Sequence, residues 1–451
     1  MICKHLKILF IAGLTLLVSN SIAQNKIAQT PPMGWNSFDC YGASVTEAEV
    51  KANADIMAAH LKEYGWEYIV IDYCWFYPYS GGMGNPPQNE DFKPALTMDH
   101  TGRLFPAVDK FPSSTDEKGF KPLADYIHSK GLKFGIHIMR GIPRQAVAFN
   151  TQIKNTGLFA KEIYNPQSTC SWLNSMYGID CNKKGAQDYY NSLIDLYAEW
   201  GVDYIKVDDI SNPYSSLEIE AIRKAIDQSG RKIVLSLSPG ATPLDQAEHV
   251  NKNANLWRIS DDFWDNWGAL KKQFERCNLW SGYIGAGHWP DADMIPIGRL
   301  NRRGPNNGLE RESHFTWTEQ KTLMTLWCIF RSPLMIGGDL TLITRSMKTL
   351  FSNKEVLAVN QNSLNNHQLS CIGQKIIWVA DIPGTNNKYV AFFNLADENT
   401  TIEVKLKDIG FENECQVRDI WQSTDLGSFT SNFQQDIAPH GSGLYKISII
   451  K

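Results

Sequence analysis

Lysine and aspartate alternate in one short run of the chain, and this pair could do chemistry. The run Asp203-Tyr204-Ile205-Lys206-Val207-Asp208-Asp209 is rich in β-branched and aromatic residues, which is typical of a buried strand. Alternate side chains of a strand share a face, so Lys206 and Asp208 point the same way. A neighbouring ammonium lowers the pKa of Asp208 and favours an ionised nucleophile. The pattern also fits a solvated strand end with an ion pair.

Further polar and aromatic side chains stand at the ends of other strand-like runs: Trp35, Asp72, His137, Ser238, Asp262 and Asp293. Buried carboxylates are costly unless they are paired, and Lys206 and Arg258 are the available cations. Two kinds of site fit this set. Two aspartates could transfer a glycosyl group while the others hold sugar hydroxyls, or the carboxylates could ligate a magnesium ion.

Glycosyl transfer would give the two aspartates different roles. Asp208 beside Lys206 would stay ionised and attack the anomeric carbon. The other carboxyl must hold a proton for the leaving oxygen, and Asp262 is the candidate. The like charge of Asp261 and the apolar residues that follow favour the protonated form of Asp262, whereas Arg258 opposes it.

These side chains can meet only if the fold brings the strand ends together. Eight strand-like runs alternate with helical segments, and the expected strands are 33–36, 68–72, 133–137, 203–209, 233–237, 256–259, 283–285 and 333–336. Eight such units close into a (β/α)8 TIM barrel, whose active site lies at the C-terminal strand ends. The fold class is therefore α/β, with the catalytic barrel expected over residues 24–360.

The pattern changes after residue 360. Short strand-like runs follow one another with turn residues between them and without helical segments. This arrangement predicts a C-terminal antiparallel β-sandwich over residues 361–451.

The first residues predict export. Lys4 and Lys7 precede the short apolar stretch 8–18, and Ser21-Ile22-Ala23 forms a small-x-small cleavage site. This is the pattern of a secretory signal, and the apolar stretch is too short to span a bilayer comfortably. We expect residues 1–23 to be a signal peptide and the protein to be periplasmic or secreted, without a membrane anchor.

An exported protein can form disulfides, and eight cysteines remain after the leader. Cys170 and Cys181 flank a loop and form the favoured pair, while Cys40 and Cys74 could bridge the top of the barrel. Two further cysteines lie in apolar helical contexts and are expected to be free core thiols: Cys277 and Cys328.

Several motifs resemble those of one enzyme family, in the same order. They are Pro31-Pro32-Met33-Gly34-Trp35-Asn36-Ser37, Ile71-Asp72-Tyr73-Cys74-Trp75, Tyr204-Ile205-Lys206-Val207-Asp208, Trp257-Arg258 with Asp262, and Trp289-Pro290-Asp291-Ala292-Asp293-Met294. The chain resembles glycoside hydrolase family 27, the α-galactosidases and α-N-acetylgalactosaminidases. The resemblance covers nearly all of the mature chain.

The resemblance implies a retaining mechanism with Asp208 as nucleophile and Asp262 as acid/base. Four residues match sugar-binding positions of the family: Asp72, Lys206, Arg258 and Asp293. No metal or other cofactor is implied, which argues against the magnesium site.

Three departures from the family concern the substrate. The second of two aspartates that hold sugar hydroxyls is Tyr73 here, and a tyrosine cannot accept hydrogen bonds as a carboxylate does. His137 replaces a family tyrosine, and an unusual segment with Arg140 and Arg144 follows it. Those arginines are either solvated loop charges or contacts to an acidic or extended glycan. Ser238 and Ala241 resemble the N-acetylgalactosaminidase branch, where they make room for an acetamido group.

The expected function is therefore an exported, retaining exo-glycosidase that removes terminal α-galactosyl residues without a cofactor. Trp35, Tyr73, His137 and Ser238 complete the expected substrate-binding set. The alternatives are an α-N-acetylgalactosaminidase, a β-L-arabinopyranosidase or a catalytically weak glycan-binding protein. The net charge of −4 makes nucleic acid an unfavourable partner, and the oligomeric state is left open.

Overall fold

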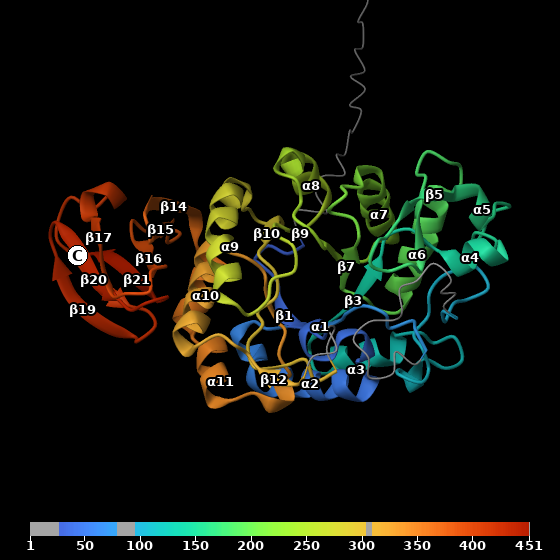
Figure 1. Ribbon diagram of the computed structural model, residues 1–451, viewed down its shortest axis with the longest axis horizontal. Helices are drawn as coiled ribbons and strands as arrows, with labels where there is room; N and C mark the ends of the chain where they lie inside the picture. Colours follow the sequence, from blue (N-terminus) through green and yellow to red (C-terminus); the bar gives the residue numbers. More distant parts are fainter. Residues whose placement is uncertain (1–26, 79–94, 304–308, 451) are drawn as a thin grey trace, which may run out of the picture.

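Eight parallel strands form the central sheet of the protein (Figure 1), whose computed structural model describes residues 27–78, 95–303 and 309–450. In spatial order the strands are β10 (Trp289–Asp291), β9 (Leu256–Arg258), β8 (Val234–Leu237), β7 (Tyr204–Asp208), β3 (Lys133–Met139), β2 (Tyr68–Ile71), β1 (Met33–Asn36) and β13 (Leu334–Ile336). Ile295 bridges Ile336, and its N–H donates to the Met335 carbonyl at 2.7 Å, which closes the sheet. The TIM barrel prediction is confirmed.

The inward-facing positions of the strands carry both the barrel's inner core and the site. Large side chains fill the interior: Tyr68, Val70, Tyr204, Val234, Leu256, Trp289 and Met335. Because a strand alternates with a period of two, Tyr204 is followed on the same face by Lys206 and Asp208. Likewise Val70 is followed by Asp72. The expected common face of Lys206 and Asp208 is confirmed, since both line one cavity.

The seventh barrel strand differs from expectation, and the strand predicted at 283–285 is wrong. Residues Ser281–Tyr283 form a short 3-10 helix, while β10 begins six residues later. In the sequence, Pro290 argues against a strand at 289–291, because proline has no N–H to donate to a neighbouring strand. The ladder to β9 does not require that N–H, since the Trp289 N–H donates to Asn255 and the Asp291 carbonyl accepts from Ile259.

Helices surround the barrel, as the figure shows for the blue to orange part of the chain. The main ones are α2 (Glu47–His60), α3 (Lys121–Ser129), α6 (Ala186–Glu199), α7 (Ser216–Ser229), α8 (Ala247–Asn253), α9 (Trp267–Trp280), α10 (Trp317–Phe330), α11 (Arg345–Phe351) and α12 (Lys354–Asn362). Thr46 and Glu49 have the spacing in the sequence that predicts a capping box, and they form one at the start of α2. A short helix, α1 (Phe38–Tyr41), directly follows β1.

An insertion between β3 and α6 adds a small antiparallel sheet. Its strands are β4 (Ile142–Pro143), β5 (Tyr164–Thr169) and β6 (Met176–Ile179), with helices α4 (Arg144–Phe149) and α5 (Ala160–Ile163) between them. The insertion matters for the site because Trp172, in the β5–β6 connection, lines the cavity.

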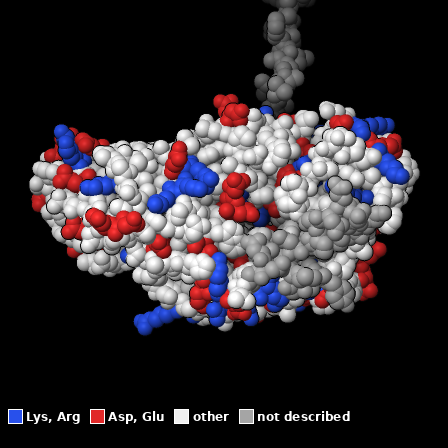
Figure 2. Space-filling model, in the orientation of Figure 1, with Lys and Arg blue, Asp and Glu red and all other residues white. Residues whose placement is uncertain are grey.

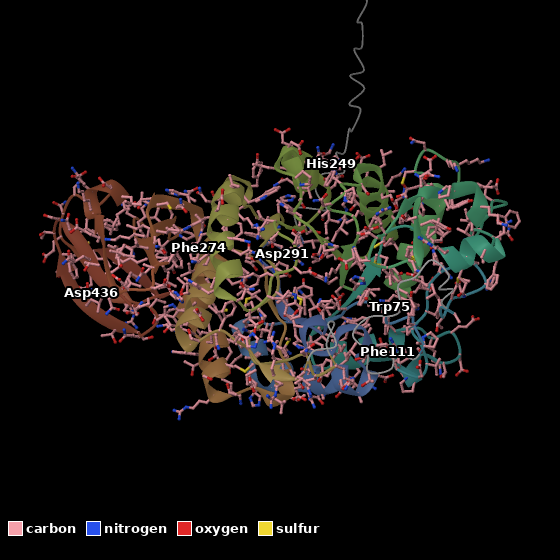
Figure 3. The ribbon with its side chains drawn as sticks, viewed as in Figure 1. Trp75, Phe111, His249, Phe274, Asp291 and Asp436 are labelled. Atoms are coloured by element: carbon pink, nitrogen blue, oxygen red, sulfur yellow. The ribbon has the colours of Figure 1, made fainter. Side chains whose placement is uncertain are left out.

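The C-terminal part is the expected β-sandwich. Its large sheet contains β14 (Leu364–Ile372), β15 (Lys375–Asp381), β16 (Lys388–Asn394), β21 (Ser442–Ile449), β18 (Cys415–Asp419) and β19 (Thr424–Phe429), and β17 (Thr400–Lys405) pairs with β20 (Asn432–Ile437). Ile377 of β15 packs in the sandwich core, whereas the neighbouring Trp378 belongs to the barrel's core. Phe274 of α9 (Figure 3) meets Phe393 at 4.9 Å between ring centroids. The large sheet therefore packs on both faces.

The predicted signal peptide, residues 1–23, lies outside the described residues. In the part of the chain that the structure describes, none of the helices has the length and apolar character needed to cross a membrane. On the face drawn in Figure 2, lysine and arginine side chains are mixed with aspartate and glutamate.

The expected disulfides are not formed: each of the eight cysteines after the leader is a free thiol. Strands β5 and β6 are antiparallel, with Thr169 opposite Tyr177. Cys170 thus follows one end of the strand pair and Cys181 follows the other, about four residues or roughly 13 Å along it. A disulfide needs Cα atoms within about 7 Å.

Cys40 and Cys74 are also unbridged, and the Cys40 thiol instead donates to the Ser37 carbonyl at 3.6 Å. The expectation for Cys277 and Cys328 is confirmed, since both are buried free thiols.

We predict that reductant leaves the melting temperature unchanged, because no covalent cross-link is lost. Protein purified without reductant and then denatured should react with a thiol reagent at all eight cysteines. Two fewer thiols, together with a dithiothreitol-dependent loss of about 2–5 kcal/mol in unfolding free energy, would instead indicate a disulfide.

Candidate active site

A cavity of about 280 Å³ opens at the C-terminal ends of the barrel strands. Seven of the residues predicted from the sequence line it: Asp72, Tyr73, Lys206, Asp208, Arg258, Asp262 and Asp293. Seven others complete the lining: Phe38, Asp39, Trp172, Pro239, Phe263, Trp264 and Met294. Its wall thus combines charged groups with aromatic rings, a composition suited to a sugar's hydroxyls and apolar C–H faces.

Asp72 and Lys206 form one polar pair of the cavity. The Lys206 ammonium donates to Asp72 Oδ2 at 2.9 Å, and Asn36 Nδ2 donates to the same oxygen at 2.8 Å. Burial alone would raise the pKa of Asp72, but Lys206 and His137 outweigh it and lower that pKa. Asp72 is therefore an ionised hydrogen-bond acceptor.

Asp208 is held by His137, which lies at the end of β3. The carboxylate accepts from His137 Nε2 at 2.7 Å through Oδ2, whereas Oδ1 has no hydrogen-bond partner among the described residues. Burial would raise the pKa of Asp208, but the attractions of His137 and Lys206 outweigh it and lower the pKa to about 2. An ionised Asp208 only accepts hydrogen bonds, so His137 carries its proton on Nε2. Oδ1 is buried as well, and it is the oxygen of Asp208 that His137 leaves without a hydrogen bond.

Arg258 joins Asp262 and Asp293 on another part of the wall. Its Nη2 lies 3.2 Å from Asp262 Oδ1 and 2.6 Å from Asp293 Oδ2. Asp293 is buried, whereas the Asp262 side chain is 56% exposed. Burial raises the pKa of Asp293, with Arg258 opposing and Asp262 and Asp291 adding to the rise. Asp262 is thus the carboxyl of this pair that solvent reaches.

Three predicted site residues do not line the cavity. Trp35 is fully buried, and its indole N–H donates to the Gly338 carbonyl at 2.9 Å. His137 is also fully buried, and it contacts the cavity lining through its hydrogen bond to Asp208 and its ring contact with Tyr73. Ser238 lies beneath the cavity, with its hydroxyl 3.5 Å from Arg258 Nη1, and Ala241 is absent from the lining as well.

Tyr73 is locked in place by aromatic rings. Its ring centroid lies 5.8 Å from that of Phe38, 5.8 Å from that of His137 and 6.1 Å from that of Trp172. Only 4% of Tyr73 is exposed. Its ring therefore forms a fixed part of the wall beside Asp72.

Models of two protein families match the chain. One described as "Alpha galactosidase A" matches residues 30–162 and 171–362, and one described as "Alpha galactosidase C-terminal beta sandwich domain" matches residues 373–447. The chain belongs to glycoside hydrolase family 27. It is a glycosidase of the α-galactosidase-like kind.

Similar proteins of this family differ in the sugar named for them. Alpha-galactosidase 3 of Arabidopsis thaliana is 29% identical over 439 residues, which are 94% of this chain and 83% of that protein. The crystal structure of a β-L-arabinopyranosidase from Geobacillus stearothermophilus has a TM-score of 0.91 at 50% identity, covering 95% of this chain and 98% of that one. A structure from Bacillus halodurans, provisionally named an α-N-acetylgalactosaminidase, has a TM-score of 0.83 at 44% identity, covering 93% and 97%.

The arginines after β3 differ from what was expected of this glycosidase, namely solvated loop charges or contacts to a glycan. Arg140 is buried, and it pairs with Asp209 at 3.0 Å and with Glu218 at 2.9 Å. Arg144 lies over the Tyr177 ring at 4.6 Å and donates to a backbone carbonyl. Neither residue lines the cavity. Arg140 also bonds to Ser168 of the insertion, so this buried arginine fixes the insertion to the barrel and is not a solvated loop charge. Arg144 holds α4 against β6 within the insertion.

We predict that His137→Ala moves the acidic limb of the kcat/KM profile to higher pH. The native pKa of Asp208 is depressed, so its ionised form persists as pH falls until that pKa is reached. A hydrogen bond to a charged group contributes about 1.5–3 kcal/mol, which corresponds to a rise of roughly one to two pH units. The measurement is kcat/KM against pH with an aryl glycoside.

His249→Ala is the matched control, because His249 lies on α8 (Figure 3) and bonds to Tyr214 and Glu220. It should leave the profile in place. An acidic limb that His137→Ala does not move would show that His137 does not hold Asp208 ionised.

Proposed function

We propose that this family 27 enzyme is a retaining exo-glycosidase that releases terminal β-L-arabinopyranosyl residues. The observation that carries the proposal is Tyr73, a fixed aromatic side chain in the wall beside Asp72. The 50% identity to a β-L-arabinopyranosidase over 95% of the chain supports it. A variant of that relative has been solved in complex with arabinose.

Arabinopyranosides and galactosides differ at one position of the ring. An L-arabinopyranoside of this configuration has the ring stereochemistry of galactose but lacks the hydroxymethyl group at C5. The resemblance to the family places a second aspartate at position 73 for sugar hydroxyls, whereas Tyr73 offers a ring and a single hydroxyl. Phe38, Trp172 and His137 pack around that ring, so it cannot turn aside to admit the extra group.

The proposed chemistry is a double displacement. Asp208 attacks the anomeric carbon, the bond to the leaving oxygen breaks, and Asp262 gives its proton to that oxygen. Water then attacks the glycosyl-enzyme as Asp262 takes up its proton, and the ester to Asp208 breaks. The depressed pKa of Asp208 and the exposure of Asp262 support these roles. Asp72, Lys206, Arg258 and Asp293 would hold the sugar hydroxyls.

Terminal α-galactosyl residues are the second candidate, as first expected from the sequence, and the family model supports them. An N-acetylgalactosaminide is less favoured, because Ser238 and Ala241 do not line the cavity. We propose no metal and no nucleic-acid partner, and the leader at 1–23 supports export to the periplasm or medium.

Aryl β-L-arabinopyranoside should be hydrolysed with a kcat/KM roughly 10–200-fold above that of the α-galactoside, since one excluded group is worth about 1–3 kcal/mol. Tyr73→Asp should narrow or reverse this ratio by opening the wall and restoring an acceptor. Tyr73→Phe, the matched control, keeps the ring and should keep the preference. A wild-type enzyme that prefers the galactoside would refute the proposed sugar.

Azide rescue separates the two aspartates. Asp208→Gly should lose activity by several orders of magnitude, and azide should restore turnover with inverted configuration by entering on the vacated side. Asp262→Ala should retain glycosylation by substrates with good leaving groups, because those need little protonation. NMR of the azide product reports the configuration, and an inverted product from Asp262→Ala would exchange the assigned roles.

A further inference from the structure

Asp39 is a buried carboxyl of the cavity that the sequence analysis did not single out. It lies on α1, is 3% exposed and lines the cavity. Its Oδ2 is buried without a hydrogen-bond partner, and no hydrogen bond or ion pair joins its side chain to another described residue. The other carboxyl oxygen, Oδ1, also has no hydrogen-bond partner in the described part of the chain but is not fully buried, so it is the oxygen that faces the cavity.

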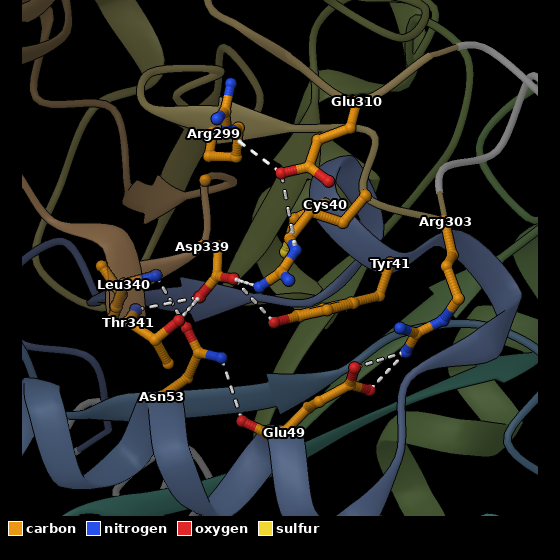
Figure 4. Close-up of polar contacts among 12 residues, drawn as sticks. Cys40, Tyr41, Glu49, Asn53, Arg299, Arg303, Glu310, Asp339, Leu340 and Thr341 are labelled. Atoms are coloured by element: carbon orange, nitrogen blue, oxygen red, sulfur yellow. Dashed lines mark hydrogen bonds and ion pairs between the residues drawn. The ribbon is translucent and has the colours of Figure 1, made fainter.

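The backbone around Asp39 is held on several sides. The Asp39 carbonyl accepts from the Asn301 N–H at 2.8 Å, and the next carbonyl, of Cys40, accepts from Arg303 at 3.2 Å. Tyr41 donates to Asp339 at 2.9 Å, within the polar network of Figure 4. This network ties α1 to the segments after β10 and β13, so α1 presents its side chains from a fixed position.

The space around the carboxyl is equally constrained. A Cβ on Gly337 would overlap Asp39 Oδ2, so the carboxyl rests directly on the glycine backbone. The side chain therefore cannot swing away from the cavity in that direction. Its placement depends on the absence of a side chain at position 337.

The electrostatic surroundings favour the protonated carboxyl. Burial raises the pKa of Asp39 well above its ordinary value, and Asp293, Asp262 and Asp72 add to the rise against Lys206. A protonated carboxyl has one O–H to donate and one oxygen to accept. A buried group of this kind that lacks a partner in the free protein is costly, and a ligand hydroxyl would satisfy it.

We propose that Asp39 is a further sugar-binding residue, whose carboxyl makes a hydrogen bond to a hydroxyl of the pyranosyl unit in the cavity. The inference rests on the proposed glycosidase site and holds for whichever pyranoside occupies it. Asp39 thereby joins the Asp72 and Asp293 sides of the wall into one continuous polar surface around the ring.

The test compares Asp39→Ala and Asp39→Asn with the wild type. Titration calorimetry with L-arabinose and D-galactose gives Kd, and kinetics with the preferred aryl glycoside give kcat and KM. Asp39→Ala should weaken monosaccharide binding about tenfold, since it leaves a sugar hydroxyl unpaired. Asp39→Asn imitates the protonated carboxyl and should lose clearly less. The melting temperature of free Asp39→Ala should not fall, because the lost group had no partner.

Cys40→Ala is the matched control, since it alters the adjacent buried residue of α1, which does not line the cavity. It should leave Kd and KM unchanged. A Kd for folded Asp39→Ala within twofold of the wild type would overturn the proposal. A loss in Cys40→Ala as large as that in Asp39→Ala would also overturn it, because it would show that α1 acts only as structure.

The same data separate this inference from the proposed substrate. A wild-type enzyme that binds galactose better than arabinose refutes the proposed sugar, and the Asp39 variants are then compared with galactose. A wild type that binds neither sugar and hydrolyses none of the aryl glycosides would overturn both proposals.

Discussion

Two buried cations govern the charges of the site. Lys206 stabilises Asp72 and Asp208, and Arg258 stands between Asp262 and Asp293. A buried carboxylate without such a partner is driven to its neutral form, because the interior solvates charge poorly. The position of each aspartate relative to these cations therefore decides which one stays an ionised acceptor and which one is shifted toward its protonated form.

The barrel sets those positions through its inner core. Tyr68, Tyr204 and Trp289 fill the interior below the site, so the strands cannot rotate to carry their inward residues elsewhere. Lys206 and Asp208 follow Tyr204 on the same face as a direct result. The large side chains inside the barrel and the charged ones at its C-terminal end thus occupy successive inward-facing positions of the same strands.

The sequence predicts much of this arrangement because its signals are local. The alternation in 203–209 and the capping box at Thr46 each depend on neighbours in the chain, and both proved reliable. The seventh strand was missed because a proline normally argues against a strand. Here the hydrogen bonds to β9 come from Trp289 and Asp291, so the missing N–H of Pro290 costs no bond. The roles of His137 and Arg140 depended on partners distant in the chain, and so did the exposure of Asp39 to the cavity. No local pattern reports such contacts. The disulfide expectation failed for the same reason, since the strand register of the insertion separates Cys170 from Cys181.

The large sheet of the sandwich has a consequence for how the two parts of the chain can be separated. Ile376, Trp378 and Phe393 belong to the same hydrophobic core as barrel residues. A chain cut after α12 would expose the apolar surface of α9 and α10. The excised sandwich would expose the apolar face of its large sheet that packs on them. The C-terminal part therefore shares a hydrophobic core with the barrel and is not an independently folded unit. It is unsuited to transfer as an independent module, and shuffled or truncated versions of this glycosidase should aggregate.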